Sequence, residues 1–205
     1  MISILKKIRN YFRNPKRIAA SLPFAKISSN AILLDSTRFD FRKGVSKFKG
    51  KINVGQGTMF GGEFIFESEQ GEVNIGDHSF INGGTKFISR SKISIGNHVT
   101  VAWNCIFYDH NSHSIDYQER QKDIHQQIED YKDGLSMIER KNWSSVKSRE
   151  INVGDNVWIG FDSVILSGVT IGEGAIIGAR SVVRENVEPW TIVAGNPAQL
   201  IKRLK

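Results

Sequence analysis

Cysteine is nearly absent from this chain of 205 residues, since Cys105 is the only one. One thiol cannot build an intramolecular disulfide framework, and this composition is usual for proteins of reducing compartments. Long apolar runs are also missing, because no stretch reaches the roughly 18 residues that a transmembrane helix needs. The N-terminus lacks the continuous apolar segment of a secretory signal. We therefore expect a cytoplasmic protein.

Acidic residues are missing from the beginning of the chain, because the first one is Asp35. Seven lysines and arginines lie within the first 26 positions, and the whole chain has a formal net charge of +7. The rest of the chain therefore has as many acidic as basic residues. The basicity belongs to an N-terminal arm, residues 1–30, so we expect no nucleic-acid-binding surface on the body.

The basic arm is predicted to form a helix over about residues 2–13. Ile4, Leu5 and Ile8 belong to an apolar stripe opposite lysines and arginines, and Asn14-Pro15 is expected to end the helix. A basic amphipathic helix can lie on an anionic surface, which would place the protein at the inner face of a membrane. The alternative is a helix packed across the base of the body or against a partner subunit.

A six-residue repeat is the main feature that the sequence does contain. Apolar residues recur at every sixth position near the C-terminus, at Val153, Ile159, Ile165, Ile171, Ile177 and Val183. Small or β-branched residues form a second series between them, at Val157, Ser163, Val169, Ala175, Ser181 and Val187. Six residues turn an α-helix by about 600°, so no helical face has this period. The period fits a chain that bends every six residues around a triangular prism, with one short strand on each face.

The same period occurs upstream, in the sets Val54-Phe60-Phe66, Ile75-Ile81-Phe87 and Ile95-Val101-Phe107. Two slips separate these sets, and we interpret them as small insertions at corners. The sequence thus predicts an all-β protein, a parallel β-helix over residues 31–205 with a short C-terminal helix at about 197–205. A β-sandwich is the alternative, which the unbroken phase over six consecutive hexads disfavours.

The repeat is interrupted between about residues 112 and 150 by a polar, charged segment. Tyr117, Ile124, Ile128 and Tyr131 lie there at roughly helical spacing. Excursions of this length in compact domains are usually functional or disordered. We expect an ordered loop, partly helical, that projects from one corner of the prism.

Two of the five histidines, His110 and His113, lie where the repeat ends and the excursion begins. A loop on a rigid scaffold can display such side chains for chemistry, and histidine is the usual general base near neutral pH. His78 and His98 follow Gly-Asp and Gly-Asn and are interpreted as solvated corner residues. No role is assigned to His125.

The C-terminal third resembles a known family. Four segments are similar to the hexapeptide-repeat O-acetyltransferases. They are Ile151-Asn-Val-Gly-Asp-Asn-Val-Trp-Ile-Gly, Val169-Thr-Ile-Gly, Ile177-Gly-Ala-Arg-Ser-Val-Val and Ala194-Gly195-Asn196-Pro197-Ala198. The resemblance covers about residues 71–205, and its closing motif is its most specific part. It implies a left-handed β-helix, a homotrimer with each active site between neighbouring subunits, and acetyl-CoA bound along the C-terminal coils, with no metal.

In this family a histidine just after the coil deprotonates the acceptor hydroxyl, and the resemblance assigns that role to His113 ahead of His110. The histidine that is not the base would orient it or contact the acceptor. Asp109 would hold the imidazole tautomer and contact the acceptor, or would only shape the turn. Cys105, flanked by apolar residues, is interpreted as a buried small hydrophobe and not as a nucleophile.

The remaining site residues are also carried over from the resemblance. Asn82 would bind the acceptor, or else be a corner asparagine, and Trp158 would pack at the CoA groove or subunit interface, or else in the core. The backbone donors of Gly160 and Ala179 would contact pantetheine. The CoA phosphates would be bound by basic side chains, namely Arg180, Arg184, Lys202 and Arg203.

The resemblance therefore implies an acetyl-CoA-dependent O-acetyltransferase that modifies a sugar hydroxyl, in polysaccharide biosynthesis because the excursion is long. N-acetylation of an amino-sugar nucleotide is the nearest alternative. A γ-class carbonic anhydrase is disfavoured, because two zinc-binding histidines would lie five residues apart on one strand, whereas His110 and His113 are three apart. A non-catalytic β-helix that organises partners is the remaining alternative.

Overall fold

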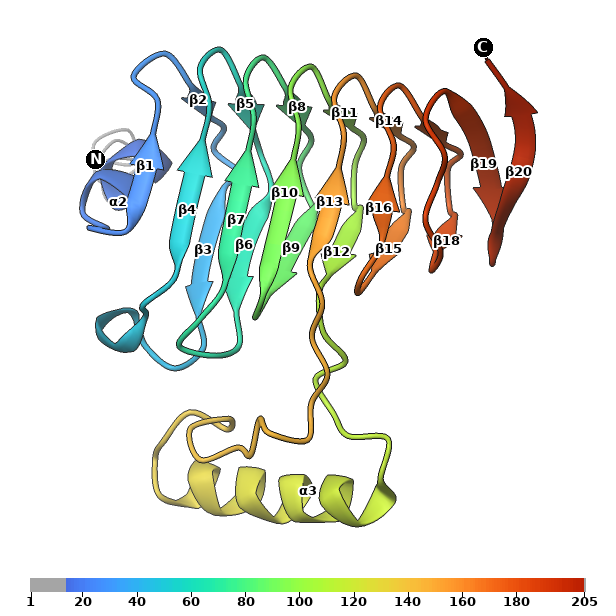
Figure 1. The fold of residues 1–205 in the computed structure, drawn as a ribbon. Helices are drawn as coiled ribbons and strands as arrows, with labels where there is room; N and C mark the ends of the chain where they lie inside the picture. Colours follow the sequence, from blue (N-terminus) through green and yellow to red (C-terminus); the bar gives the residue numbers. More distant parts are fainter. Residues whose placement is uncertain (1–13, 205) are drawn as a thin grey trace, which may run out of the picture.

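The structure, a computed structural model, describes residues 14–204, which form a left-handed parallel β-helix with one projecting arm (Figure 1). The chain winds around a triangular prism whose three faces are β-sheets, called here faces A, B and C. Face A contains β1 (Ala25–Ile27), β4 (Lys51–Val54), β7 (Glu72–Ile75), β10 (Lys92–Ile95), β13 (Ile151–Val153) and β16 (Thr170–Ile171).

Face B contains β2 (Ile32–Leu33), β5 (Met59–Phe60), β8 (Phe80–Ile81), β11 (Thr100–Val101), β14 (Trp158–Ile159), β17 (Ile176–Ile177), β19 (Thr191–Gly195) and β20 (Ala198–Arg203). Face C contains β3 (Arg38–Phe41), β6 (Glu63–Phe66), β9 (Lys86–Ser89), β12 (Ile106–Tyr108), β15 (Val164–Leu166) and β18 (Val182–Val183). Each turn of the chain adds one short strand to each face in the order A, B, C.

The six-residue repeat is the core of this helix, as the sequence predicts. All members of both C-terminal series are buried, and the parallel register stacks equivalent residues, for example Ile75, Ile95, Val153 and Ile171 on face A. Burial of each such aliphatic side chain contributes roughly 1.5–3 kcal/mol. The two slips in the repeat are insertions at the corner between faces C and A, also as predicted.

The N-terminal coils fill the same interior with aromatic rings. Phe87 stacks on Phe107 with ring centroids 4.7 Å apart, and Phe60 stacks on Phe64 at 4.3 Å. These rings are fully buried. The core therefore changes from phenylalanine-rich to isoleucine-rich along the axis without a change of fold.

The structure corrects the predicted ends of the β-helix. The helix begins at β1, before residue 31, because Ala25 already pairs with Ile52 of the next coil. The C-terminal segment is not a helix: β20 turns back at Asn196-Pro197 and pairs antiparallel with β19. Pro15 begins α2 (Pro15–Ala20), with Asn14 as its N-cap. The helix predicted over residues 2–13 lies outside the described residues.

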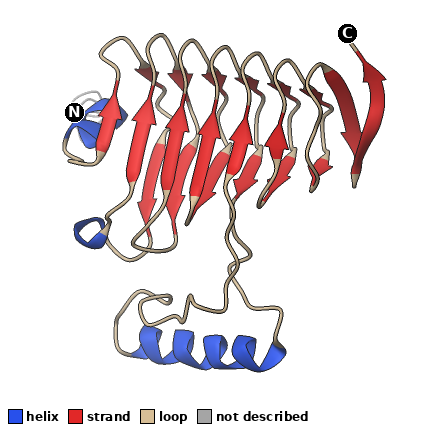
Figure 2. Ribbon diagram, viewed as in Figure 1, coloured by secondary structure: helices blue, strands red, loops and turns tan. Residues whose placement is uncertain are grey.

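The predicted excursion is an ordered arm that leaves the body after β12 and returns at β13 (Figures 1 and 2). Because β10 and β13 still pair directly, the arm does not disturb the stacking of coils. It contains α3 (Tyr117–Lys132), capped by Asp116. Lys47 of the short 3₁₀ helix η1 (Val45–Lys47) forms an ion pair with Glu139 of the arm. Over residues 14–204, no helix is both long and apolar enough to cross a membrane.

Helix α3 packs its charged side inward. Asp123 and Asp130 are buried against the returning segment of the arm, where Arg140 pairs with Asp130. The apolar residues of the helix are exposed instead, together with apolar residues just outside its two ends. This outer surface is called here the arm stripe, and it consists of Ile115, Tyr117, Ile124, Ile128, Tyr131, Leu135 and Met137. A surface helix normally buries its apolar face, but no residue within 14–204 packs over the apolar face of α3.

Candidate active site

His113 lies in the arm just beyond the end of β12, and its side chain is 46% exposed. Its Nδ1 lies 3.2 Å from Oδ2 of Asp123, which comes from α3. Its Nε2 makes no hydrogen bond with any residue in the described range. A free ring nitrogen on an accessible histidine is what a general base requires.

Asp123 is itself paired on its other side. Lys141, from the segment that follows α3, donates to the same Oδ2, and its Nζ lies 3.5 Å from Nδ1 of His113. The side chains of Asp123 and Lys141 are only 7% and 3% exposed. Lys141 also lies over the ring of Trp143, 5.3 Å from its centroid. His113 is thus the exposed end of a buried charged group.

His110 is in the opposite situation. Its side chain is fully buried, with Nδ1 2.8 Å from Oδ1 of Asp109 and Nε2 3.0 Å from Oε2 of Glu67. Ser112 donates to the same Glu67 oxygen at 2.6 Å. Both ring nitrogens are therefore engaged by carboxylates, and neither is available to an acceptor in this arrangement.

The two carboxylates shift the ionisation of this cluster. Burial opposes the charged form of His110, but the hydrogen bonds and charges of Asp109 and Glu67 outweigh it, and the pKa of His110 is raised. Burial likewise opposes ionised Glu67, but the hydrogen bonds from His110 and Ser112 outweigh it, and its pKa is lowered. His110 is therefore an ion-paired anchor at the root of the arm.

Asp109 is fully buried and does not contact an acceptor, which corrects that part of the prediction. Its carboxylate accepts hydrogen bonds from the hydroxyl of Ser89 at 2.8 Å and from the backbone N–H groups of Arg90 and Ser91, each at 2.9 Å. With His110 as a fourth donor, the carboxylate is saturated. Asp109 holds the ring of His110 through Nδ1, and the carboxylate at His113 is Asp123 instead.

A second, apolar part of the candidate site is a groove of about 440 Å³ along the outer side of face B. Trp158 lies here and is 53% exposed, so the core-packing alternative is wrong. Phe80, Trp103 and Phe161 are further exposed aromatic residues of the groove. Asn82 also lines it and donates to the carbonyl of Val101 at 3.3 Å.

The two predicted backbone donors in this groove differ in availability. The N–H of Gly160 donates to the carbonyl of Ile177 at 2.8 Å, so it is used by the β-helix and cannot bind pantetheine. The N–H of Ala179 is not donated to any of the described residues. A Cβ on Gly160 would lie 2.6 Å from the nitrogen of Ala179. The glycine is required there for the close approach of two coils.

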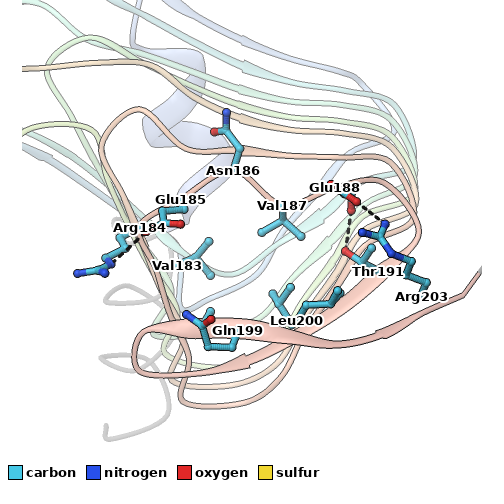
Figure 3. Close-up of a pocket in the computed structure, with 12 residues that line it drawn as sticks. Val183, Arg184, Glu185, Asn186, Val187, Glu188, Thr191, Gln199, Leu200 and Arg203 are labelled. Atoms are coloured by element: carbon cyan, nitrogen blue, oxygen red, sulfur yellow. Dashed lines mark hydrogen bonds and ion pairs between the residues drawn. The ribbon is translucent and has the colours of Figure 1, made fainter.

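The predicted phosphate-binding residues are spread toward the C-terminal end. Arg180 follows Ala179 and lies over the ring of Phe161, 5.8 Å from its centroid. Arg184 lines a separate cavity of about 200 Å³ under β20, shown in Figure 3, where Arg203 pairs with Glu188. Lys202 is exposed on β20 and does not line that cavity.

The two parts of the site lie at different places on the prism. His113 follows face C, at the corner where the chain returns to face A, whereas Asn82 and Trp158 belong to face B and the corner that follows it. The structure therefore groups Asn82 with the predicted cofactor residues and not with the histidine. Glu67, Asp123 and Lys141 could not be predicted as site residues from the sequence, because no periodic signal links them to His113.

Three further predictions concern single residues. His78 and His98 are exposed corner residues with φ of 53° and 56°, and their rings stack at 5.4 Å. Cys105 is buried, and burial raises its pKa to about 11, so it is not a ready nucleophile. No three His, Cys, Asp or Glu side chains converge as a metal site within residues 14–204.

Comparisons with known proteins agree with the architecture. Residues 150–185 match the family model described as bacterial transferase hexapeptide (six repeats). A Schizosaccharomyces pombe protein named as an acetyltransferase is 33% identical over 133 residues, which are 65% of this chain and 54% of that protein. The lipopolysaccharide biosynthesis O-acetyl transferase WbbJ of Escherichia coli K12 is 26% identical over 75% of this chain and 72% of its own length.

Among solved structures, a hexapeptide-repeat acetyltransferase of Vibrio cholerae in complex with acetyl coenzyme A is similar. It has a TM-score of 0.53 and 25% sequence identity, over 93% of this chain and 76% of that chain. The fold and the repeats define this protein as a left-handed β-helix of the hexapeptide class. The chain contains the hexapeptide repeat of bacterial transferases over residues 150–185 and is similar to hexapeptide-repeat acetyltransferases in sequence and fold. Its alignment spans only about half of the S. pombe relative.

Proposed function

We propose that this protein is an acetyl-CoA-dependent O-acetyltransferase that modifies a sugar hydroxyl, with His113 as general base. One observation carries the proposal. His113 is the histidine at the root of the arm that combines an exposed side chain, a free Nε2 and a carboxylate on Nδ1. His110, three residues away, has none of this freedom.

The position of His113 supports the following reaction. Nε2 of His113 accepts the proton of the acceptor hydroxyl as its oxygen attacks the thioester carbonyl of acetyl-CoA. The tetrahedral intermediate then collapses, the carbon–sulfur bond breaks, and the imidazolium returns the proton to the CoA thiolate. The products are an O-acetyl ester and CoA, and the histidine is regenerated neutral.

The face B groove is the proposed site of acetyl-CoA. Its exposed aromatic residues and the free N–H of Ala179 suit the apolar, amide-containing pantetheine arm. Arg180 next to it is placed to meet a phosphate. The Vibrio cholerae relative was solved with acetyl coenzyme A, which supports the choice of cofactor.

A homotrimer is part of the proposal, because His113 and the groove lie at different corners of one chain. Pairing of one subunit's histidine with a neighbour's groove would complete the site, and a heterologous contact of this kind closes into a ring. The arm stripe and the exposed aromatic residues of face B are two apolar surfaces that such an assembly would cover.

The acceptor is proposed to be a glycan or lipid-linked sugar of polysaccharide biosynthesis. The name of WbbJ, which aligns over most of both chains, supports that class. We propose a cytoplasmic location, with membrane contact through the basic N-terminal arm.

The test starts with titration calorimetry of acetyl-CoA on the purified protein, with and without zinc. Saturable binding that is independent of zinc is expected, and a folded protein that binds none would contradict the proposal. A screen of sugar and amino-sugar acceptors with a free-thiol readout follows, comparing the wild type with His113→Ala and with the exposed control His125→Ala. Ester products support the proposal, whereas amide products alone would make the protein an N-acetyltransferase.

A further inference from the structure

We propose that Asp123 and Lys141 form a positioning pair that fixes the tautomer of His113, so that the arm holds its base ready only when it is folded. The proposal rests on the function proposed above and deepens it. Asp123 lies on α3 and Lys141 on the segment after α3, so the two side chains reach His113 from 10 and 28 residues away along the chain.

The direction of the hydrogen bond sets the tautomer. An ionised carboxylate only accepts, so the 3.2 Å contact between Oδ2 of Asp123 and Nδ1 of His113 favours a proton on Nδ1. The competing contact, in which Nζ of Lys141 would donate to an unprotonated Nδ1, is longer at 3.5 Å. A neutral imidazole carries one proton, and Nε2 then has the lone pair. Nε2 is the nitrogen that makes no hydrogen bond with the described residues, so the free nitrogen and the basic nitrogen are the same atom.

Lys141 forms an ion pair with Asp123 in a buried place. An isolated buried carboxylate would be strongly penalised, and the ammonium group compensates its charge. The same ammonium sits beside the protonated Nδ1, so the group presented to His113 is a neutral ion pair and not a bare negative charge.

Stability alone does not account for this pair. Buried ion pairs are often replaceable by apolar residues without loss of stability, so their presence is weak evidence for a folding role. The arm also contains a second ion pair on the same helix, Asp130 with Arg140, which has no contact with His113. The two pairs form a natural comparison, because both tie α3 to the returning segment.

The experiment compares Asp123→Asn with the matched control Asp130→Asn. In Asp123→Asn the amide can donate to Nδ1 and favours the opposite tautomer. We expect kcat to fall about 10²-fold or more, toward the roughly 10⁴-fold loss known for the analogous change in the serine protease triad. The KM for acetyl-CoA should change by less than about twofold, and Asp130→Asn should keep kcat within about threefold.

The tautomer is measured directly by ¹⁵N NMR on histidine-labelled protein, with the His113 signals assigned through His113→Gln. The wild type should carry its proton on Nδ1, and Asp123→Asn should carry it on Nε2. A wild-type proton on Nε2, or an unchanged kcat in folded Asp123→Asn, would overturn the proposal. If circular dichroism shows that Asp123→Asn is unfolded, the proposal is tested by the wild-type tautomer alone.

This design separates the two proposals. The NMR result needs no acceptor and no turnover, so it stands even where transfer is not observed. If His113→Ala abolishes transfer while Asp123→Asn leaves it intact, the proposed function holds and the positioning pair fails. If the wild type neither binds acetyl-CoA nor transfers acetyl groups, the proposed function fails whatever the tautomer is.

Discussion

The coils and the arm of this protein are built on opposite principles. The coils bury aliphatic and aromatic columns, which include Ile159 and Phe87. The arm buries charged side chains, such as Asp123 and Lys141, and leaves its apolar helix face outside. A repeated apolar interior is close-packed and rigid, but it offers no reactive side chains. A buried charged group destabilises the fold unless it is fully paired.

The difference separates two tasks. The coils hold the two ends of the arm at β12 and β13, and the anchor of Asp109, His110 and Glu67 fixes its root. The arm then presents one exposed histidine on a prearranged carboxylate. The rigid coils position the arm, and the charged residues of the arm orient the imidazole of His113 and set which of its nitrogens carries the proton.

The largest expected effect comes from a charge in the coils. Ile159→Asp would place an unpaired carboxylate at a fully buried position of β14, inside the β-helix. We expect a loss of more than about 4 kcal/mol in the free energy of unfolding, or no folded protein, because the carboxylate would have no partner. Chemical denaturation followed by circular dichroism measures it. A stable, cooperative Ile159→Asp would contradict the dry core described here.

A smaller, local effect is expected when the arm loses a charge. Lys141→Met leaves Asp123 with His113 as its remaining partner, and breaking a buried pair from one side costs about 3–5 kcal/mol. The loss should be confined to the arm, so hydrogen exchange should speed up in α3 and stay unchanged in β13 and β16. Faster exchange in the coils as well would show that arm and coils are one cooperative unit.

The anchor at the arm root predicts a moderate dependence on pH. His110 has a raised pKa, so its stabilisation is complete below its ordinary value of 6.5 and is lost as the pH rises through the raised value. Glu67 has a lowered pKa, so its contribution is present above its ordinary value of 4.5 and is lost as the pH falls through the lowered value. Arm stability should therefore be greatest between pH 4.5 and 6.5.

Thermal melts from pH 5 to 9, combined with hydrogen exchange in the arm, test this dependence. The titrating component above pH 6.5 should disappear in His110→Gln and persist in the exposed control His125→Gln. An identical profile in His110→Gln and the wild type would show that another group is responsible.

The smallest effect on folding is expected on the arm stripe. Ile128→Asp changes an exposed side chain of α3, so the free energy of unfolding of one chain should change by less than about 0.5 kcal/mol. The same charge should weaken the proposed trimer, because it would be buried against a neighbour. Analytical ultracentrifugation of Ile128→Asp, with Gln127→Asp as control, would measure the weakened trimer. Equal association of the two variants would show that the arm stripe is not part of the interface.

The same contrast explains what the sequence could reveal. The coils were predictable because each hexad repeats the same local requirement, and even the two slips fell at corners. The C-terminal segment was predicted wrongly as a helix, since β20 owes its form to pairing with β19 and not to its own residues. The choice of His113 came from a resemblance, and the residues around it could not be found, because Asp123 and Lys141 meet it only through the aperiodic fold of the arm.

The most direct test of the proposed mechanism is acetyl transfer by His113→Ala, measured together with acetyl-CoA binding by calorimetry on the same preparation. The mechanism predicts that affinity for acetyl-CoA stays within about twofold, while transfer to the best acceptor of the screen falls by at least about 10²-fold, as expected for loss of a general base. Retention of most of the turnover in a variant with normal acetyl-CoA binding would contradict the assignment of His113 as the base.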